Sequence, residues 1–387
     1  MTWEILQGDV RDKIAEIPEK SIQCVVTSPP YFGLRDYGHE GQIGLEPAPE
    51  EYVANMVEVF RGLWRVLRDD GVAFLNLGDS YNANYRGGGA GNASKKQVSN
   101  QGTVDFMATK PNHIKGCKPK DLVGIPWLVA FALRADGWYL RSDIIWHKPN
   151  PMPESVADRP TKSHEYIFLL TKSQKYFYDA EAVREPIKEN SGACSVRTAT
   201  KPEDKRESQS LTRKYDVIKG ANKRSVWTVA TKPYKEAHFA VFPEQLIEPC
   251  ILAGTSPQAC EVCGSPWERV VEVQGETTTE KAKRLGHSEK RGAGGKLVKQ
   301  NLDYAGGHGD NIRPRNTTGW QPTCTCKNSG KGRSIVLDPF AGSGTTLYVA
   351  EQHGRDSIGI ELSPDYVKLI KKRMDNMQQT IFSMGVE

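Results

Sequence analysis

The stretch IVLDPFAGSGTTLYVAEQHGRDSIGIE, residues 335–361, has the pattern of a strand, a glycine-rich turn, a helix and a second strand. Asp338 ends the first apolar run, and Gly342 and Gly344 open the helix. Glu361 ends the second strand nineteen positions after Gly342, where nucleotide-binding α/β folds place an acidic side chain that accepts hydrogen bonds from ribose hydroxyls. The stretch therefore predicts a parallel α/β sheet that binds a nucleoside.

The turn lacks the features of a phosphate-binding loop. No Lys follows Gly344, as a phosphate-cradling loop would require, and Leu347 stands where dinucleotide-binding turns have a third glycine. Asp338 at the start of the turn would also repel a pyrophosphate and attract a cation. A nucleoside with a positively charged tail fits best, and S-adenosylmethionine is one.

Earlier parts of the chain alternate apolar runs with helical spacing. Strands are predicted at 3–9, 21–28, 71–80, 139–148 and 164–173. Helices are predicted at 10–18, 49–71 and 121–137, and within 238–254. This alternation is typical of a mostly parallel, doubly wound α/β sheet.

Two motifs carry a resemblance to a known family. The motif TSPPY, residues 27–31, ends a predicted strand, and DPFAGSGTT, residues 338–346, follows about three hundred residues later. Together they resemble the amino-methylating DNA methyltransferases of the permuted beta group, in which the catalytic motif precedes the cofactor motif. The likeness extends over residues 3–81, 122–179, 226–254 and 334–374.

The resemblance implies a Rossmann-like class I methyltransferase fold, circularly permuted, with the N-terminal strand beside the strand at 357–361. It also implies transfer of a methyl group from S-adenosylmethionine to the exocyclic amine of a base flipped out of duplex DNA. The cofactor residues that it implies are Asp9, His238, Phe242, Pro243, Asp338, Phe340, Gly342, Gly344, Thr345 and Glu361. As alternatives, Asp9 caps the helix that follows it and His238 is a structural histidine.

The corner Ser28-Pro29-Pro30-Tyr31 suits the chemistry of such a target. An exocyclic amine is a poor nucleophile because its lone pair is delocalised into the ring. The proline backbone can present the Pro29 carbonyl as one acceptor and the Ser28 hydroxyl as a second contact, and Tyr31 offers a face for stacking. Asp79, at the end of another predicted strand, is expected to orient the base or take up a proton, or else to cap a helix.

Ser28 favours cytosine N4 as the target, because relatives that methylate adenine N6 usually have Asp or Asn at this position. N6-adenine is the alternative. Methylation at cytosine C5 would need a thiolate nucleophile. The Pro-Cys pair at Cys250 lies on an apolar helical face, so that cysteine is expected to be buried.

Four cysteines are expected to bind one structural Zn²⁺. Cys260 and Cys263 have knuckle spacing, and Cys324 and Cys326 form a tighter pair. The ion would close the base of a zinc-ribbon-like insert, residues 256–333; unligated thiols are the alternative. The catalytic domain is then predicted at 1–183, 236–255 and 334–387, with a candidate target-recognition insert at 184–235.

The charge distribution predicts a polyanionic partner. Three segments, 82–120, 184–235 and 268–333, together contain 33 Lys or Arg and 14 Asp or Glu, whereas the rest of the chain contains 19 and 33. Basic inserts on an acidic scaffold favour double-stranded DNA as the partner.

A non-catalytic zinc-ribbon DNA-binding protein with a degenerate methyltransferase fold is the alternative from another functional class. Methylation of RNA or of protein amides is a lesser one.

The chain starts without a signal-peptide pattern and contains no membrane-length apolar run. A cytoplasmic protein with reduced thiols and no membrane partner is therefore expected. A restriction endonuclease is a possible companion of such an enzyme. The sequence does not determine the recognition site or the oligomeric state.

Overall fold

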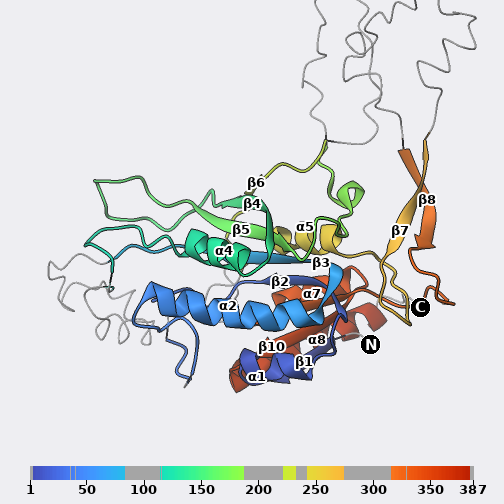
Figure 1. The fold of residues 1–387 in the computed structure, drawn as a ribbon, viewed down its shortest axis with the longest axis horizontal. Helices are drawn as coiled ribbons and strands as arrows, with labels where there is room; N and C mark the ends of the chain where they lie inside the picture. Colours follow the sequence, from blue (N-terminus) through green and yellow to red (C-terminus); the bar gives the residue numbers. More distant parts are fainter. Residues whose placement is uncertain are drawn as a thin grey trace, which may run out of the picture. The chain divides into compact units, whose positions relative to one another are not determined.

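The computed structural model describes residues 3–34, 36–39, 41–82, 114, 116–186, 221–231, 242–273, 315–327 and 329–383. Its centre is an eight-stranded sheet in the order β1-β10-β9-β2-β3-β5-β4-β6 (Figure 1). The strands are β1 (Trp3–Gln7), β2 (Ile22–Thr27), β3 (Leu67–Leu77), β4 (Tyr139–His147), β5 (His164–Thr171), β6 (Val226–Thr228), β9 (Ile335–Asp338) and β10 (Asp356–Glu361).

Most of the sheet is parallel, as predicted. Strands β1, β10, β9, β2 and β3 run in one direction, and β5 is antiparallel to both β3 and β4. The expected pairing of the N-terminal strand with the strand at 357–361 is confirmed, since Trp3 pairs with Ser357 and Gln7 with Glu361. Strands from the two ends of the chain thus lie side by side.

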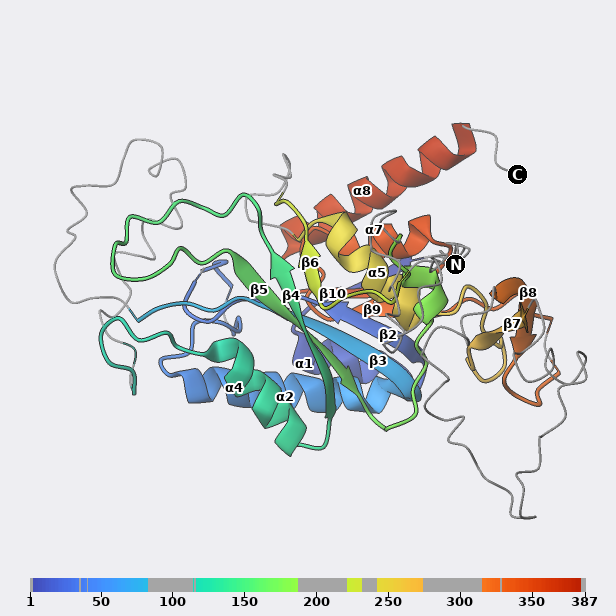
Figure 2. The same cartoon turned by 90° about the horizontal axis from the view of Figure 1, so that it is seen from above.

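Helices cover both faces of the sheet (Figure 2). The helices are α1 (Val10–Lys13), α2 (Pro49–Val66), α4 (Ile125–Ala135), α5 (Glu244–Gly254), α7 (Thr345–Gln352) and α8 (Pro364–Ser383). Side chains of β2 alternate between the faces: Val25 belongs to the core under α2 and α4, whereas Cys24 and Val26 pack with α5 and α7. Cys250 on α5 is buried in the second core, as expected.

One predicted boundary is wrong. The helix expected at 49–71 ends at Val66, and β3 begins at Leu67. Leu67 has an extended backbone (φ −71°, ψ 138°) and pairs with Ile22, because a buried leucine at the start of a central strand gains ladder pairing that a longer helix would forgo. Sheet pairing thus overrides the helical spacing of residues 67–71.

The chain divides into two compact units. The first comprises Met1–Val183, Arg224–Trp267 and Pro322–Glu387, and contains the large sheet; the second comprises Arg184–Lys223 and Glu268–Gln321. The last part of the predicted recognition insert 184–235, from Arg224 onward, therefore belongs to the first unit. There, Ile145 N donates to Ser225 O (2.8 Å) and Trp227 is buried, so β6 completes the sheet.

A separate two-stranded sheet pairs β7 (Trp267–Val273) with β8 (Arg315–Pro322). Most of the three basic segments lies outside the described residues, so their predicted contact with DNA stays a prediction. None of the helices in the described part of the chain is both long enough and apolar enough to span a membrane.

Candidate active site

A cleft of about 880 Å³ opens at one edge of the large sheet. Residues that directly follow strands line it: Gly8 after β1, Ser28 after β2, Gly78 after β3, Pro339 after β9 and Leu362 after β10. The carboxyl ends of parallel strands meet at the same edge, which is where open α/β sheets bind ligands. The volume is within the range of small-molecule sites.

The glycine turn forms one wall of the cleft. Gly342 (φ 54°) and Gly344 (φ 75°) both have left-handed backbones. A Cβ atom on Gly344 would lie 3.0 Å from Ile370 Cγ1, so a side chain there would collide with α8. The sequence pattern thus identified two positions that need glycine.

Glu361 lies beneath this turn and faces the cleft. Its Oε2 accepts a hydrogen bond from Gly342 N (2.8 Å), and its Oε1 accepts one from Ser363 N (2.8 Å). Burial raises the pKa of this carboxyl to about 7. The second lone pair of each oxygen can accept from a ribose hydroxyl, so the geometry fits the predicted role.

Asp338 is placed differently from the prediction. Its Oδ1 accepts from Thr27 Oγ1 (2.8 Å) and Phe340 N (3.1 Å), and its Oδ2 accepts from Thr346 Oγ1 (2.6 Å). The side chain is fully buried, does not line the cleft, and has its pKa raised to about 6 by burial. Asp338 therefore fixes the shape of the glycine turn and does not itself face a ligand.

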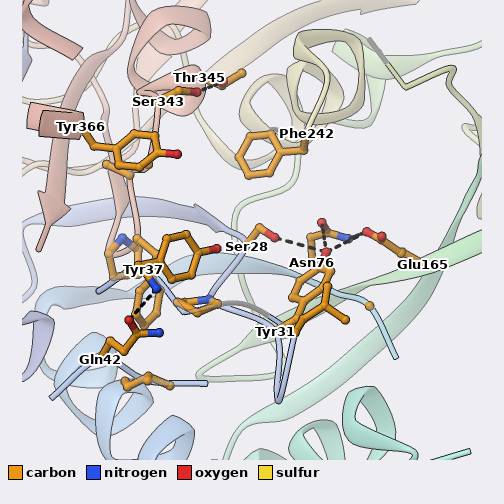
Figure 3. A pocket seen from close by; sticks show the side chains of 18 of the residues that line it. Ser28, Tyr31, Tyr37, Gln42, Asn76, Glu165, Phe242, Ser343, Thr345 and Tyr366 are labelled. Carbon is orange, nitrogen blue, oxygen red and sulfur yellow. Dashed lines mark hydrogen bonds between the residues drawn. The ribbon is translucent and has the colours of Figure 1, made fainter. Parts of the chain in front are cut away.

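Two aromatic rings face the space below the turn (Figure 3). Phe242, predicted, and Tyr366, which sequence reasoning missed, lie on its two sides, with Ser343 and Thr345 nearby. Tyr366 is in the first turn of α8, and no motif marks it. Of the other residues predicted for this wall, Phe340 lines the cleft, and Pro243 is the N-cap residue of α5. His238 lies outside the described residues.

Asp9 lines the cleft, but its side chain also caps the helix that follows it, α1. Its Oδ1 accepts from Arg11 N (2.8 Å) and it forms an ion pair with the Arg11 guanidinium. These hydrogen bonds, chiefly from the Arg11 side chain, lower the pKa of the Asp9 carboxyl. The structure therefore favours the alternative that Asp9 caps α1.

The Ser28–Tyr31 corner forms the opposite wall. Tyr52 Oη donates to Pro30 O (2.9 Å), which holds the corner on the core, while Pro29 is buried behind it. The Tyr31 ring lies against Gly78, where a Cβ atom would be 2.5 Å from Tyr31 Cε2. Ser28, Pro30 and Tyr31 all line the cleft.

Asp79 caps a helix. Its Oδ1 accepts from Gly124 N (2.9 Å) and Ile125 N (3.2 Å) at the start of α4, and only 4% of its side chain is exposed. Sequence reasoning left this alternative open beside a role in orienting the base. The hydrogen bonds favour capping.

Three further polar residues surround Tyr31. Tyr31 Oη donates to Glu165 Oε2 (2.7 Å), lies 3.1 Å from Asn76 Oδ1, and Lys148 forms an ion pair with Glu165. Glu165 reaches the cleft because β5 is antiparallel, so the start of β5 lies at the edge where its neighbours end. The sequence patterns do not reveal this orientation, which explains why Glu165 was missed.

A separate cluster contains the four predicted metal ligands. The sulfur atoms of Cys260, Cys263, Cys324 and Cys326 all lie within 4.8 Å of one another. A backbone bridge from Ala259 to Pro266 closes the turn that carries the first cysteine pair, and a bridge from Ala259 to Gly332 joins this turn to the segment that follows the second pair. Four thiols in this arrangement fit a tetrahedral zinc ion.

The raised pKa of Glu361 predicts a pH-dependent stability. The carboxyl has a pKa of about 7 in the folded chain against 4.5 as its ordinary value, so between these values the folded state binds a proton that the unfolded state lacks. Its stabilising contribution is complete below the lower value and is lost as the pH rises through the higher one. Urea unfolding from about pH 5 to about pH 8 should therefore show a steeper decline for the wild type than for Glu361→Gln; equal slopes would contradict the assignment.

The strand order and the cleft define a mostly parallel α/β fold with a glycine turn and a proline corner at one sheet edge. Residues 22–260 and 324–372 match the N6/N4-type DNA methylase family. The chain belongs to this family, which confirms the predicted class of DNA amino-methyltransferases.

Individual relatives support the same family. The chain is 38% identical to the type II methyltransferase M.Cfr9I of Citrobacter freundii, over 98% of this chain and 90% of the relative. It is 37% identical to M.SmaI of Serratia marcescens, over 96% and 90%. The solved PvuII DNA methyltransferase (cytosine-N4-specific) has a similar fold, with a TM-score of 0.51, 16% identity, and coverage of 96% of this chain and 86% of that one.

Proposed function

We propose that this enzyme transfers a methyl group from S-adenosylmethionine to the exocyclic N4 amine of a flipped cytosine in duplex DNA. The observation that carries the proposal is that the Ser28–Tyr31 corner and the Gly342 turn open on one cleft. A base held at the corner and a sulfonium held at the turn would then meet inside the cleft, away from bulk water.

The protein would hold the cofactor through contacts to its ribose and to its adenine ring. Glu361 can accept from the ribose hydroxyls, and the rings of Phe242 and Tyr366 can enclose the ligand between them. The adenine, ribose and methionine parts together suit a cleft of this size. Asp338 contributes indirectly, by holding the turn in its left-handed shape.

The corner would prepare the amine for attack. Among the described residues, Tyr52 donates to the carbonyl of Pro30 but none donates to that of Pro29. The Ser28 hydroxyl, which lines the cleft, can accept from one amine N–H. Pro29 is buried and does not line the cleft, so the Pro29 carbonyl can accept from the other N–H only if the corner shifts when the base binds. Such contacts localise the nitrogen lone pair and orient it toward the sulfonium methyl group.

Cytosine is favoured over adenine because Ser28 stands where adenine-N6 enzymes usually have Asp or Asn. The decisive experiment is to methylate duplex DNA with the purified enzyme, digest it to nucleosides and identify the product by mass spectrometry. N4-methylcytosine is expected. N6-methyladenine would leave the amino-methyltransferase class intact and overturn the assignment of the base.

We also propose that the enzyme is a site-specific modification enzyme of a type II restriction system, because relatives similar over nearly the whole chain carry type II names. The permuted beta-group order fits the position of the corner before the glycine turn. Recognition of the DNA sequence is assigned to the predicted inserts 184–235 and 256–333. Of these, Arg184–Lys223 and Glu268–Gln321 form the second compact unit, and the remaining residues belong to the unit with the large sheet.

One structural zinc ion is proposed at the four cysteines. Bound there, it would cross-link the two ends of the insert. Elemental analysis should find about one zinc per chain, and Cys324→Ser should remove it and lower the thermal midpoint, whereas Cys117→Ser, outside the cluster, should retain it. Wild-type protein without zinc after purification in the absence of chelators would contradict the proposal.

A further inference from the structure

A one-way chain of hydrogen bonds leads from the proposed amine site to a carboxylate. Ser28 Oγ donates to Tyr31 Oη over 3.4 Å, and Tyr31 Oη donates to Glu165 Oε2 over 2.7 Å (Figure 3). Tyr31 Oη has a second acceptor in Asn76 Oδ1 at 3.1 Å, and we assign its one hydrogen to Glu165 Oε2 because that distance is the shorter. With the hydrogens in this order, the outer lone pairs of Ser28 Oγ remain able to accept a proton from the cleft. This polarity is the one that a proton relay requires.

The end of the chain is held in place from several sides. Lys148 forms an ion pair with Glu165 and lies 4.2 Å from the centre of the Trp146 ring. Asn76 Nδ2 lies 3.4 Å from Glu165 Oε2 and donates to Tyr166 O (3.1 Å). Only 13% of the Glu165 side chain is exposed. The carboxylate is thus positioned and charge-balanced at the rim of the cleft.

The intermediate hydroxyl is suited to passing a proton on. Burial and the nearby Glu165 charge raise the pKa of Tyr31, so the phenol keeps its proton at neutral pH. It can give that proton to Glu165 only while receiving one from Ser28.

The reaction has to dispose of a proton, and the other carboxylates near the cleft are engaged. After methyl transfer the nitrogen carries a positive charge and one hydrogen too many. Asp79 caps α4, and Asp338 is buried beneath the glycine turn. Asp9 and Glu154 form ion pairs with Arg11 and Arg159, and Glu361 accepts from two backbone N–H groups at the glycine turn. A serine hydroxyl alone cannot retain a proton at neutral pH.

We propose that Glu165 receives, through Tyr31 and Ser28, the proton that the methylated amine loses. The amine lone pair forms the N–C bond, the C–S bond breaks, and its electron pair stays on the sulfur. The amine proton passes to Ser28 Oγ, the Ser28 proton passes to Tyr31 Oη, and the Tyr31 proton passes to Glu165 Oε2. Glu165 then releases it to water. The inference rests on the proposed amine methylation, and Glu165 is a positioning residue because it acts through Tyr31.

Glu165→Gln is the sharpest test, since the amide oxygen still accepts from Tyr31 but cannot take up a proton. The single-turnover methylation rate should fall by about 100-fold. Binding of S-adenosylmethionine and DNA, and the fluorescence of 2-aminopurine placed at the target position, should stay within about threefold of wild type. Glu248→Gln is the matched control and should leave the rate unchanged, because this carboxylate on α5 lies outside the cleft, 3.2 Å from His353 Nε2.

Tyr31→Phe provides an independent test because it keeps the ring and removes the relay. Its single-turnover loss should resemble that of Glu165→Gln, and the double variant should be no slower than the slower single variant, since both changes break one chain. A loss of less than about tenfold in Glu165→Gln overturns the proposal. So does a loss accompanied by a vanished 2-aminopurine signal, or a multiplicative double variant. Failure of the proposed function itself would appear differently, as wild-type enzyme that forms no methylated base.

Discussion

Tyr31→Ala is expected to reduce the single-turnover rate of methyl transfer by at least about a thousandfold. The ring is the stacking face of the corner, and stacking contributes roughly 1–3 kcal/mol per base. Its removal also empties the space against Gly78 and breaks the hydrogen bond to Glu165, so the base loses its fixed position. A misplacement of about 1 Å costs roughly a further hundredfold.

The measurement is rapid-quench methylation with enzyme in excess over duplex DNA. Tyr139→Ala is the matched control, because this partly exposed tyrosine at the start of β4 does not line the cleft. It should behave as wild type. A Tyr31→Ala variant that retains a rate within tenfold of the control would show that the corner is not the place where the base reacts.

Gly344→Val is expected to weaken binding of S-adenosylmethionine by at least about 100-fold and to abolish methylation with it. The left-handed backbone at φ 75° costs a side chain roughly 1–2 kcal/mol. In addition, its Cβ would lie 3.0 Å and 3.2 Å from two carbons of Ile370, so the turn must shift. A shifted turn withdraws the Gly342 N–H from Glu361 and reshapes the ribose site.

Gly354→Val separates backbone strain from this collision. Gly354 has a similar backbone angle (φ 69°), nothing lies within 4 Å of the position of its Cβ, and it follows α7 outside the cleft. Isothermal titration with S-adenosylmethionine should give wild-type affinity for Gly354→Val. Equal affinities for the two variants would contradict the assignment of the cofactor turn.

Particular motifs determined much of the fold in advance. Apolar runs bounded by Gly8, Ser28 and Gly342 predicted strands that the structure contains, and the pairing of β1 with β10 followed from the motif order. Glycines with left-handed backbones and prolines with fixed φ leave few local conformations. The local structure that these residues predict is therefore retained in the folded protein.

The acidic residues were less predictable. Asp9, Asp79 and Asp338 all follow or end strands, yet two of them cap helices and the third is sealed beneath a turn. A carboxylate at the end of a strand can accept a hydrogen bond from a ligand or from a backbone N–H, and the local sequence does not distinguish the two. Which of these it meets depends on neighbours distant in sequence, such as Gly124 and Thr27.

The sequence by itself determined the family-defining motifs, the glycine turn, the proline corner and the four cysteines, because each is a short segment whose residue types restrict its own backbone or ligands. Only the tertiary structure decided that Tyr31, Asn76 and Glu165 meet. Their contact depends on β5 running against its neighbours, which brings the first residues of one strand to the last residues of another. Strand direction is set by the packing of the whole sheet, and no local pattern of residues encodes it.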